Sequence, residues 1–388
     1  MFFTLVGSGI LVMSLYVGWR LGSVPWLARR LPWWVRAVLL LLLGSAYITA
    51  RSAERAGWPA TARVLETVGA HWIGVLLLLF VAMLAGDILT GFGFFLRRRA
   101  AAVRGCALMA GIGLVILALV QGHRAPVVRD YELRLAGLAP QRDGTVIVFI
   151  SDLHLGSLLG EAWLNARVAQ IAALRADAIV VGGDILEGDS ASESRLVPLL
   201  GRLSAPLGVW AVPGNHEYHG GGAASLQSLE TYGFHVLRSE WKELAPGLVL
   251  AGIDNGRERH DQRGSPPLED PTPAAAPAGD PLARALAGRP ASSTTILVSH
   301  MPARADDAAR AGVGLMLSGH THDGQIWPFR YVVGIRFRYL AGRYDVAGMP
   351  LIVCRGTGTF GPRMRLWYPS EIVRVTLRSP DIVSQRGR

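Results

Sequence analysis

Residues 145–154 read TVIVFISDLH, a run of β-branched and apolar side chains that leads directly into an aspartate and a histidine. A short apolar run of this kind is typical of a strand buried on both faces. Apolar residues then recur at helical spacing at Leu164, Val168, Ile171 and Leu174. A second apolar run, at 178–181, leads into Asp184. This alternation of strand and helix predicts an α/β fold.

Polar side chains follow several more of these apolar runs. The further predicted strands span 207–212, 248–253, 295–298, 315–317 and 351–353. Five strands end in candidate metal ligands, and open α/β sheets place their sites at such strand ends. The side chains delivered there are Asp152 and His154, then Asp184, then Asn215 with His216 and Glu217, then His300, and finally His320 and His322.

The spacing of these residues suggests a shared site. In an extended chain, residues two apart point to the same side, so Asp152 and His154 can reach one ion, and His320 and His322 can face one cluster. Glycines precede Asp184, Asn215 and His320, and they predict tight turns with close backbone approach. Carboxylate, imidazole and amide ligands without thiolate suit Mn, Fe or Zn. The two cysteines lie 248 positions apart, which excludes a disulfide scaffold and a Cys-rich zinc module.

Each motif alone has an ordinary structural explanation, but five in order after apolar strands favour a metal site. Five of the eight histidines after residue 127 lie in these motifs. The other three, His219, His235 and His260, are predicted to be ordinary surface residues. His219 is close enough to the third motif to touch a substrate.

The first third of the chain has the composition of a membrane domain. The chain is 51% hydrophobic and only 18% charged, which excludes a disordered protein. Four apolar runs, each near the ~20 residues that a membrane-spanning helix needs, predict a four-helix transmembrane domain over residues 1–126. A cleaved signal peptide would explain only the first run. The predicted helices lie at about 2–19, 33–50, 70–96 and 105–122.

Charge is concentrated in the same third. Residues 1–126 hold twelve arginines and three acidic residues, so they carry +9 of the net charge of +10. Because this charge flanks apolar runs, no nucleic-acid partner is expected. The loops at 20–32 and 97–104 hold seven arginines, which the positive-inside rule assigns to the cytoplasm. We therefore expect a multi-pass protein of the cell (plasma or inner) membrane, with residues 127–388 on the outer or periplasmic side. Asp87, inside the third run, is expected to be wetted or paired near the arginines rather than functional.

The ordered motifs resemble those of the calcineurin-like metallophosphoesterases. The matching motifs are D-L-H (152–154), G-G-D (182–184), G-N-H-E (214–217), S-H (299–300) and G-H-T-H (319–322), and the resemblance extends through G-T-G-T-F-G-P (356–362). With its apolar N-terminal third, the chain is most similar to the transmembrane proteins with a metallophosphoesterase domain and their bacterial relatives. It departs from the family at Glu217, where many members have Asp, and in a Pro/Ala-rich segment at 264–281, which we expect to be a mobile surface insertion.

The resemblance implies a sandwich of two mixed β-sheets flanked by helices over residues 127–388. It implies two divalent ions, one held by Asp152, His154 and His322, the other by Asn215, His300 and His320, with Asp184 bridging both. A hydroxide formed on the metals would attack phosphorus. His216 would donate to a phosphoryl oxygen or to the leaving group. Glu217 is a weak candidate for orienting His216, because adjacent side chains in an extended segment diverge.

The expected activity is hydrolysis of a phosphoester or pyrophosphate on a small molecule or lipid. A bilayer anchor favours a lipid-linked or cell-envelope phosphate. A UDP-2,3-diacylglucosamine hydrolase of lipid A biosynthesis is an alternative, although its cytoplasmic substrate disagrees with the expected topology. Another alternative is a non-catalytic membrane binding or regulatory protein, but no motif position has been replaced by an apolar residue. Other zinc hydrolases are disfavoured because the chain lacks H-E-x-x-H and P-C-x-x-C.

Four aromatic residues could form a lipid-facing rim, although core packing is the favoured interpretation: Trp327, Phe329, Trp367 and Tyr368.

Overall fold

The computed structural model describes residues 2–187, 190–218, 222–254 and 279–380. The chain divides into two compact units. The first holds residues 1–124 together with the short segment 361–367, and the second holds residues 125–360 and 368–388.

The first unit is helical. Its helices are α1 (Phe2–Leu21), α2 (Pro25–Arg30), α3 (Trp33–Arg55), α4 (Pro59–Leu89) and α5 (Ala100–His123). Within the described residues, three stretches are long and apolar enough to cross a membrane, namely Trp33–Ala50, Pro59–Leu89 and Ala100–His123. The structure therefore supports three candidate spans rather than clearly four, and a crossing at 2–19 stays a prediction.

The third apolar run differs from its predicted bounds of 70–96. Helix α4 begins at Pro59, where a proline suits the first turn because its missing N–H would have no partner there. The helix ends at Leu89, and the chain then turns through Gly91 and Gly93, whose φ angles are +58° and +90°. Such angles lie outside the right-handed helical region, so the apolar residues up to Leu96 form turns instead.

Asp87 is fully buried within this unit. Its carboxylate accepts hydrogen bonds from the Tyr16 hydroxyl at 2.5 Å and from Arg104 Nε at 2.8 Å, and it also pairs with Arg20. The expected pairing with the arginine-rich end of the helices is confirmed, whereas the alternative of a wetted carboxylate is wrong. One buried carboxylate thus joins α1, α4 and α5.

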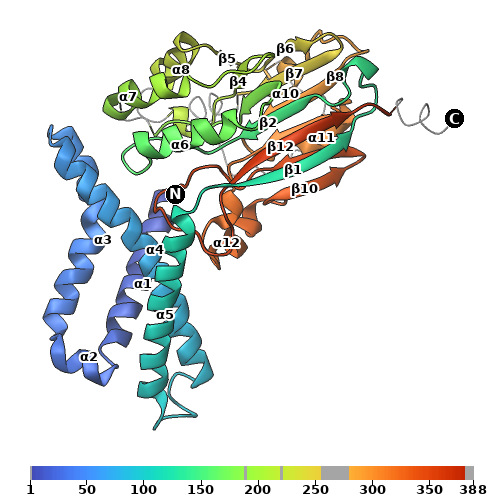
Figure 1. Ribbon diagram of the computed structural model, residues 1–388. Helices are drawn as coiled ribbons and strands as arrows, with labels where there is room; N and C mark the ends of the chain where they lie inside the picture. The colour runs from blue at the N-terminus through green and yellow to red at the C-terminus, as the bar shows by residue number, and fades with distance from the viewer. Residues whose placement is uncertain (1, 188–189, 219–221, 255–278, 381–388) are drawn as a thin grey trace. The chain divides into compact units, whose positions relative to one another are not determined.

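The second unit contains two mixed sheets, as predicted (Figure 1), and each has six strands. The first has the order β1-β12-β2-β3-β4-β5 and the second β10-β11-β9-β8-β7-β6. In the first sheet β2 to β5 run parallel, while β12 is antiparallel to β2. In the second, β7, β8, β9 and β11 run parallel, and β6 and β10 are antiparallel to their neighbours.

The strands are β1 (Val127–Arg134), β2 (Val146–Ile150), β3 (Ala178–Val181), β4 (Val209–Ala211), β5 (Phe234–Val236), β6 (Glu240–Ala245), β7 (Leu248–Ile253), β8 (Thr294–Ser299), β9 (Leu315–Ser318), β10 (Gly342–Val346), β11 (Met349–Val353) and β12 (Glu371–Arg378).

Apolar side chains fill the space between the sheets and the space outside each. Phe149 and Val180 of the first sheet share one buried cluster with Leu250, Val298 and Leu317 of the second. The outer face of the first sheet packs on α6 (Glu161–Ala172), α7 (Ser190–Leu200) and α8 (Gly222–Thr231). The outer face of the second packs on α10 (Pro281–Leu286) and α11 (Ala305–Arg310). The central strands β2, β3 and β7 contain no polar side chain, as expected of strands covered on both faces.

The predicted insertion and two of the four aromatic residues differ from expectation. Of the predicted insertion at 264–281, residues 264–278 lie outside the described part of the chain, and Pro281 instead begins α10, with Asp280 as its N-terminal cap. Core packing of the four aromatic residues is wrong for two of them, since Phe329 is 46% exposed and Trp367 is 50% exposed.

Candidate metal centre

The predicted ligands gather at the carboxyl ends of β2, β3, β4, β8 and β9. Their ligand atoms form three groups that could each hold a metal ion, with all atoms of a group within 4.8 Å of one another. The groups are Asp152–His154–His322, His154–Asp184–His216 and Asp184–His300–His320. The groups share members, so they form one continuous cluster.

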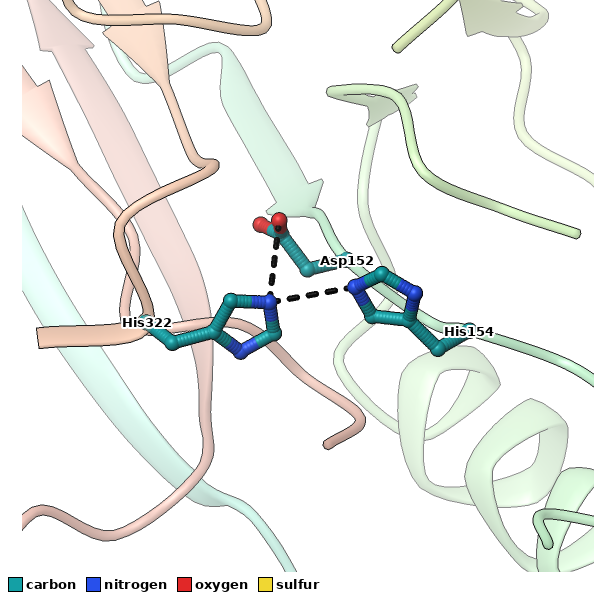
Figure 2. A group of neighbouring side chains, drawn as sticks. All are labelled: Asp152, His154 and His322. Atoms are coloured by element: carbon teal, nitrogen blue, oxygen red, sulfur yellow. Dashed lines mark hydrogen bonds and ion pairs between the residues drawn. The ribbon is translucent and has the colours of Figure 1, made fainter. Parts of the chain in front are cut away.

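The first group brings together residues 170 positions apart in the sequence (Figure 2). His322 Nε2 lies 3.1 Å from His154 Nε2 and 3.4 Å from Asp152 Oδ1. Figure 2 shows both rings and the carboxylate pointing toward one another. Two imidazole nitrogens and a carboxylate oxygen facing one space are a suitable ligand set for a divalent transition metal.

Asp184 belongs to both of the other groups, His154–Asp184–His216 and Asp184–His300–His320. Its Oδ2 lies 3.1 Å from His300 Nε2 and 3.8 Å from His154 Nε2, so this one carboxylate faces both groups. His300 Nε2 is also 3.1 Å from His320 Nδ1. Burial raises the pKa of the Asp184 carboxyl, but the facing imidazoles, His300 first, more than offset it and hold the pKa well below its usual value.

Asn215 supplies the test of whether a cation fits. Its side-chain Oδ1 is buried and has no hydrogen-bond partner within the described chain. A buried carbonyl oxygen without a donor is costly, and a bound cation would satisfy it. The orphaned oxygen and the facing imidazole nitrogens therefore fit a metal centre, and the donor set contains no thiolate.

The backbone at the site is not extended, contrary to the prediction. Asp152 and His154 have φ angles of +55° and +46°, and His320 and His322 have +71° and +50°. These are left-handed conformations, which non-glycine residues adopt at a cost and which tend to cluster at functional sites. His320 and His322 face one cluster, as predicted, but they belong to different groups within it.

Two glycines confirm the predicted close backbone approach. A Cβ on Gly214 would lie 2.2 Å from Asp184 Oδ1, and a Cβ on Gly319 would lie 2.3 Å from Asp152 Oδ2. Contacts this short are impossible for a carbon atom, so any larger residue would push the carboxylate aside. Glycine thus allows the loops after β4 and β9 to lie against the candidate ligands.

Glu217 stabilises the backbone of the site. The residue is 1% exposed. Its carboxylate accepts hydrogen bonds from four backbone amides: Gly214 and Ile185 at 2.6 Å, Asp184 at 3.0 Å and Leu186 at 3.1 Å. The weak expectation that Glu217 orients His216 is replaced by this role, in which it joins the loops after β3 and β4.

Glu187 is the residue that the sequence reasoning missed. Its Oε1 lies 2.5 Å from His154 Nδ1, and its Oε2 lies 3.2 Å from His216 Nδ1. A carboxylate behind a histidine fixes the ring and its tautomer. Burial lowers the pKa of His216, but the hydrogen bond to Glu187 and the charge of Asp184 more than offset it and raise the pKa to about 9. The available signal was an acidic residue three positions after Asp184.

His300 is oriented by the backbone. Its Nδ1 lies 2.8 Å from the carbonyl oxygen of Gly182, which directs Nε2 toward Asp184. Burial lowers the pKa of His300, but the charge of Asp184 and its hydrogen bond outweigh burial and raise the pKa to about 9.

Phe360 is a second residue that the sequence reasoning did not single out. Its ring centroid lies 5.3 Å from those of both His154 and His216 and 6.1 Å from that of His322. The side chain is 50% exposed. An aromatic ring therefore borders the cluster on its solvent side.

His235 does not belong to any of the three groups. His235 is exposed on β5, with its ring 4.5 Å from that of Trp210, so the expectation of a surface residue is confirmed there. His219 and His260 lie outside the described residues.

Comparisons with known proteins agree with this geometry. A family model described as calcineurin-like phosphoesterase matches residues 145–324. An uncharacterized metallophosphoesterase of Helicobacter pylori is 32% identical over 60% of this chain and 59% of its own length. A transmembrane protein with metallophosphoesterase domain from Bos taurus is 30% identical over 70% of this chain and 62% of its own. An uncharacterized metallophosphoesterase of Aquifex aeolicus is 33% identical over 60% of this chain and 84% of its own. The chain spans about 60% of the length of the first two of these relatives.

Proposed function

The chain belongs to the calcineurin-like metallophosphoesterases, and we propose that it is a membrane-anchored enzyme that hydrolyses a phosphoester or pyrophosphate at a dinuclear metal centre. The observation that carries this proposal is the convergence of Asp152, Asp184 and five histidines on one cluster, beside the orphaned Oδ1 of Asn215.

The proposed division of ligands follows the two outer groups. Asp152, His154 and His322 hold one ion, Asn215, His300 and His320 hold the other, and Asp184 faces both. A pair of Mn, Fe or Zn ions bound there would supply positive charge to a phosphoryl group and lower the pKa of a water molecule. Which of these metals binds in the cell is a matter for elemental analysis.

His216 is the proposed proton donor. Its Nδ1 lies 3.2 Å from Glu187 Oε2, and this carboxylate favours the protonated form of the ring. A protonated imidazole beside the cluster can donate to a phosphoryl oxygen or to the departing oxygen, which is general acid catalysis. Glu187 does not touch the substrate in this scheme and acts by positioning His216 and His154.

The proposed substrate is a lipid-linked or cell-envelope phosphate. Three candidate spans keep the centre near a bilayer, so a phosphate carried by a membrane molecule is always within reach. We further propose that α1 is a fourth crossing and that residues 127–388 face the outer side of the cell membrane. The arginine-rich loops at 20–32 and 97–104 support this orientation.

The test uses the full-length chain in detergent, loaded in turn with Mn, Fe or Zn. Chromogenic phosphate monoesters and diesters are assayed beside Asp184→Asn, with bound metal counted by elemental analysis. The matched control is Asp306→Asn, which alters a 55% exposed carboxylate on α11. We expect two ions per chain and metal-dependent turnover, both reduced in Asp184→Asn and kept in the control. Equal turnover in Asp184→Asn and the wild type, or no turnover with any metal, would refute the proposal.

A further inference from the structure

Helix α12, Phe329–Arg336, presents an apolar face to solvent. Tyr331 is 66% exposed, Val332 55% and Ile335 86%, and no residue of the helix is buried. Val332 follows Tyr331 by one residue and Ile335 follows it by four, so the three positions fall on one side of an α-helix. Soluble proteins seldom leave such a continuous apolar face open unless something binds it.

The helix is fixed to the metal centre at both ends. At its start, Gly324 approaches the Arg330 backbone so closely that a Cβ would lie 2.3 Å from Arg330 Cα. Arg330 Nε also lies 3.1 Å from Asp323 Oδ1, next to the candidate ligand His322. After its end, the ring of Phe337 lies 5.1 Å from that of His320. The exposed face is therefore connected to the site by contacts at both ends of the helix.

The charged side chains of α12 and its flanking residues are all basic. Residues 327–338 contain three arginines and no acidic residue. Arg330 is engaged with Asp323, whereas Arg336 and Arg338 lie at the exposed end of the helix. The Arg338 side chain is 74% exposed, and its ion pair with Asp306 is long, at 3.6 Å. Basic side chains bordering an apolar face complement an anionic lipid surface.

We propose that α12 lies in the headgroup layer of an anionic bilayer, with Tyr331, Val332 and Ile335 inserted among the lipids. The chain's own spans keep a bilayer within reach at all times, which favours lipid over a separate protein. Apolar and aromatic side chains with flanking arginines are what helices lying in a membrane interface use. Because α12 is fixed to His320 and His322, the metal centre then works at the membrane surface. This inference rests on the proposed function, and it makes the substrate a phosphoester carried by a molecule embedded in that membrane.

Depth-dependent quenching tests this proposal on the full-length chain in nanodiscs. Ile335→Cys is labelled with an environment-sensitive fluorophore in a Cys106→Ala background, since Cys354 is buried and Cys106 is exposed. Phosphatidylcholine carrying an acyl-chain nitroxide is the quencher. The matched control is Tyr232→Cys, which replaces a 43% exposed aromatic residue after α8. We expect several-fold stronger quenching at residue 335 than at residue 232. Equal quenching at the two positions would overturn the proposal.

Two further measurements separate lipid from other occupants. Adding phosphatidylglycerol should strengthen quenching at residue 335, and R336Q with R338Q should remove that gain. A bismaleimide cross-linker that joins two chains through Ile335→Cys would instead place a second copy of the chain on this face and refute the proposal. Quenching is read without turnover, so it stands apart from the proposed function, which the assay of a soluble phosphodiester tests on its own.

Discussion

Glu187 contacts two imidazoles at once, one from a candidate metal ligand and one from the candidate proton donor. Residue types at strand ends indicated the ligands, because aspartate, asparagine and histidine after an apolar run are visible in the sequence. The role of Glu187 was not visible, since it arises from residues 184–187 lying alongside residues 154–155, joined by a bridge between Leu155 and Leu186. That pairing is a tertiary contact, which no local pattern encodes.

Replacing Glu187 by glutamine tests its positioning role. Loss of the charge behind His154 should lower metal affinity about 10- to 100-fold, as for other carboxylates behind ligating histidines. Calorimetric titration of the metal-free chain with Mn or Zn measures this directly. Glu161→Gln is the matched control, because Glu161 is exposed at the start of α6. Unchanged affinity in Glu187→Gln would show that the carboxylate does not support the centre.

Replacing Gly214 by alanine tests the close backbone approach. The added Cβ would meet Asp184 Oδ1 at 2.2 Å and the Asp184 amide nitrogen at 2.3 Å. The loop must shift, so we expect a loss of about 1–3 kcal/mol in the free energy of unfolding, as for overpacked sites, together with weaker metal binding. Gly160→Ala is the control, since a Cβ there meets nothing within 4 Å. Chemical denaturation and metal titration of both variants give the comparison, and similar behaviour of the two would contradict the expectation.

At the scale of elements, the sequence located the strands that are buried on both faces. The bounds of β3 and β7 match the predicted runs because every residue in them is buried and apolar. Strand β1 was not predicted because most of its residues are polar and exposed. Strand β5 has only three residues, which is too short for a periodic pattern. The turns after the strands were predicted as extended because side-chain spacing does not report φ.

Glu217 offers a test at this scale, because it joins the turn after β3 to the turn after β4. Glu217→Ala would remove the acceptor for four buried amides. Leaving even part of this set unpaired should cost about 3 kcal/mol or more, since each buried unsatisfied group costs about 1–3 kcal/mol. Glu217→Asp retains a carboxylate and should lose less. Urea denaturation of the metal-free chain measures both, and an equal loss in the two variants would argue against the amide contacts as the cause.

At the scale of the whole molecule, composition separated a helical N-terminal third from a sandwich, but it did not assign every segment. Residues 361–367 cluster with the N-terminal helices although they lie far along the chain. The Arg365 amide donates to the Ala118 carbonyl at 2.9 Å, and the Trp367 amide donates to Gln121 Oε1 at 2.7 Å. A segment of seven residues is too short for its composition to predict which unit it packs against. A boundary at residue 126 accordingly stays a prediction.

Asp87 is expected to be essential to the stability of the helical unit. Asp87→Ala would leave Arg20 and Arg104 buried without their counter-ion, and breaking a buried ion pair costs about 3–5 kcal/mol. The variant should therefore melt well below the wild type in detergent, as followed by circular dichroism. Glu54→Ala is the control, because Glu54 is exposed on α3. A melting temperature equal to that of the control would show that the cluster contributes little.

The number of crossings decides where the metal centre faces, because each crossing moves the chain to the opposite side. With four crossings, the N-terminus and residues 127–388 share one side. With only the three candidate spans, they lie on opposite sides. Two single cysteines in a Cys106→Ala background distinguish these cases: one appended before Met1, and Arg202→Cys on the exposed surface. A membrane-impermeant maleimide applied to intact cells should label both if α1 crosses. Labelling at residue 202 alone would reduce the spans to three, and labelling of residue 202 only after lysis would put the metal centre in the cytoplasm.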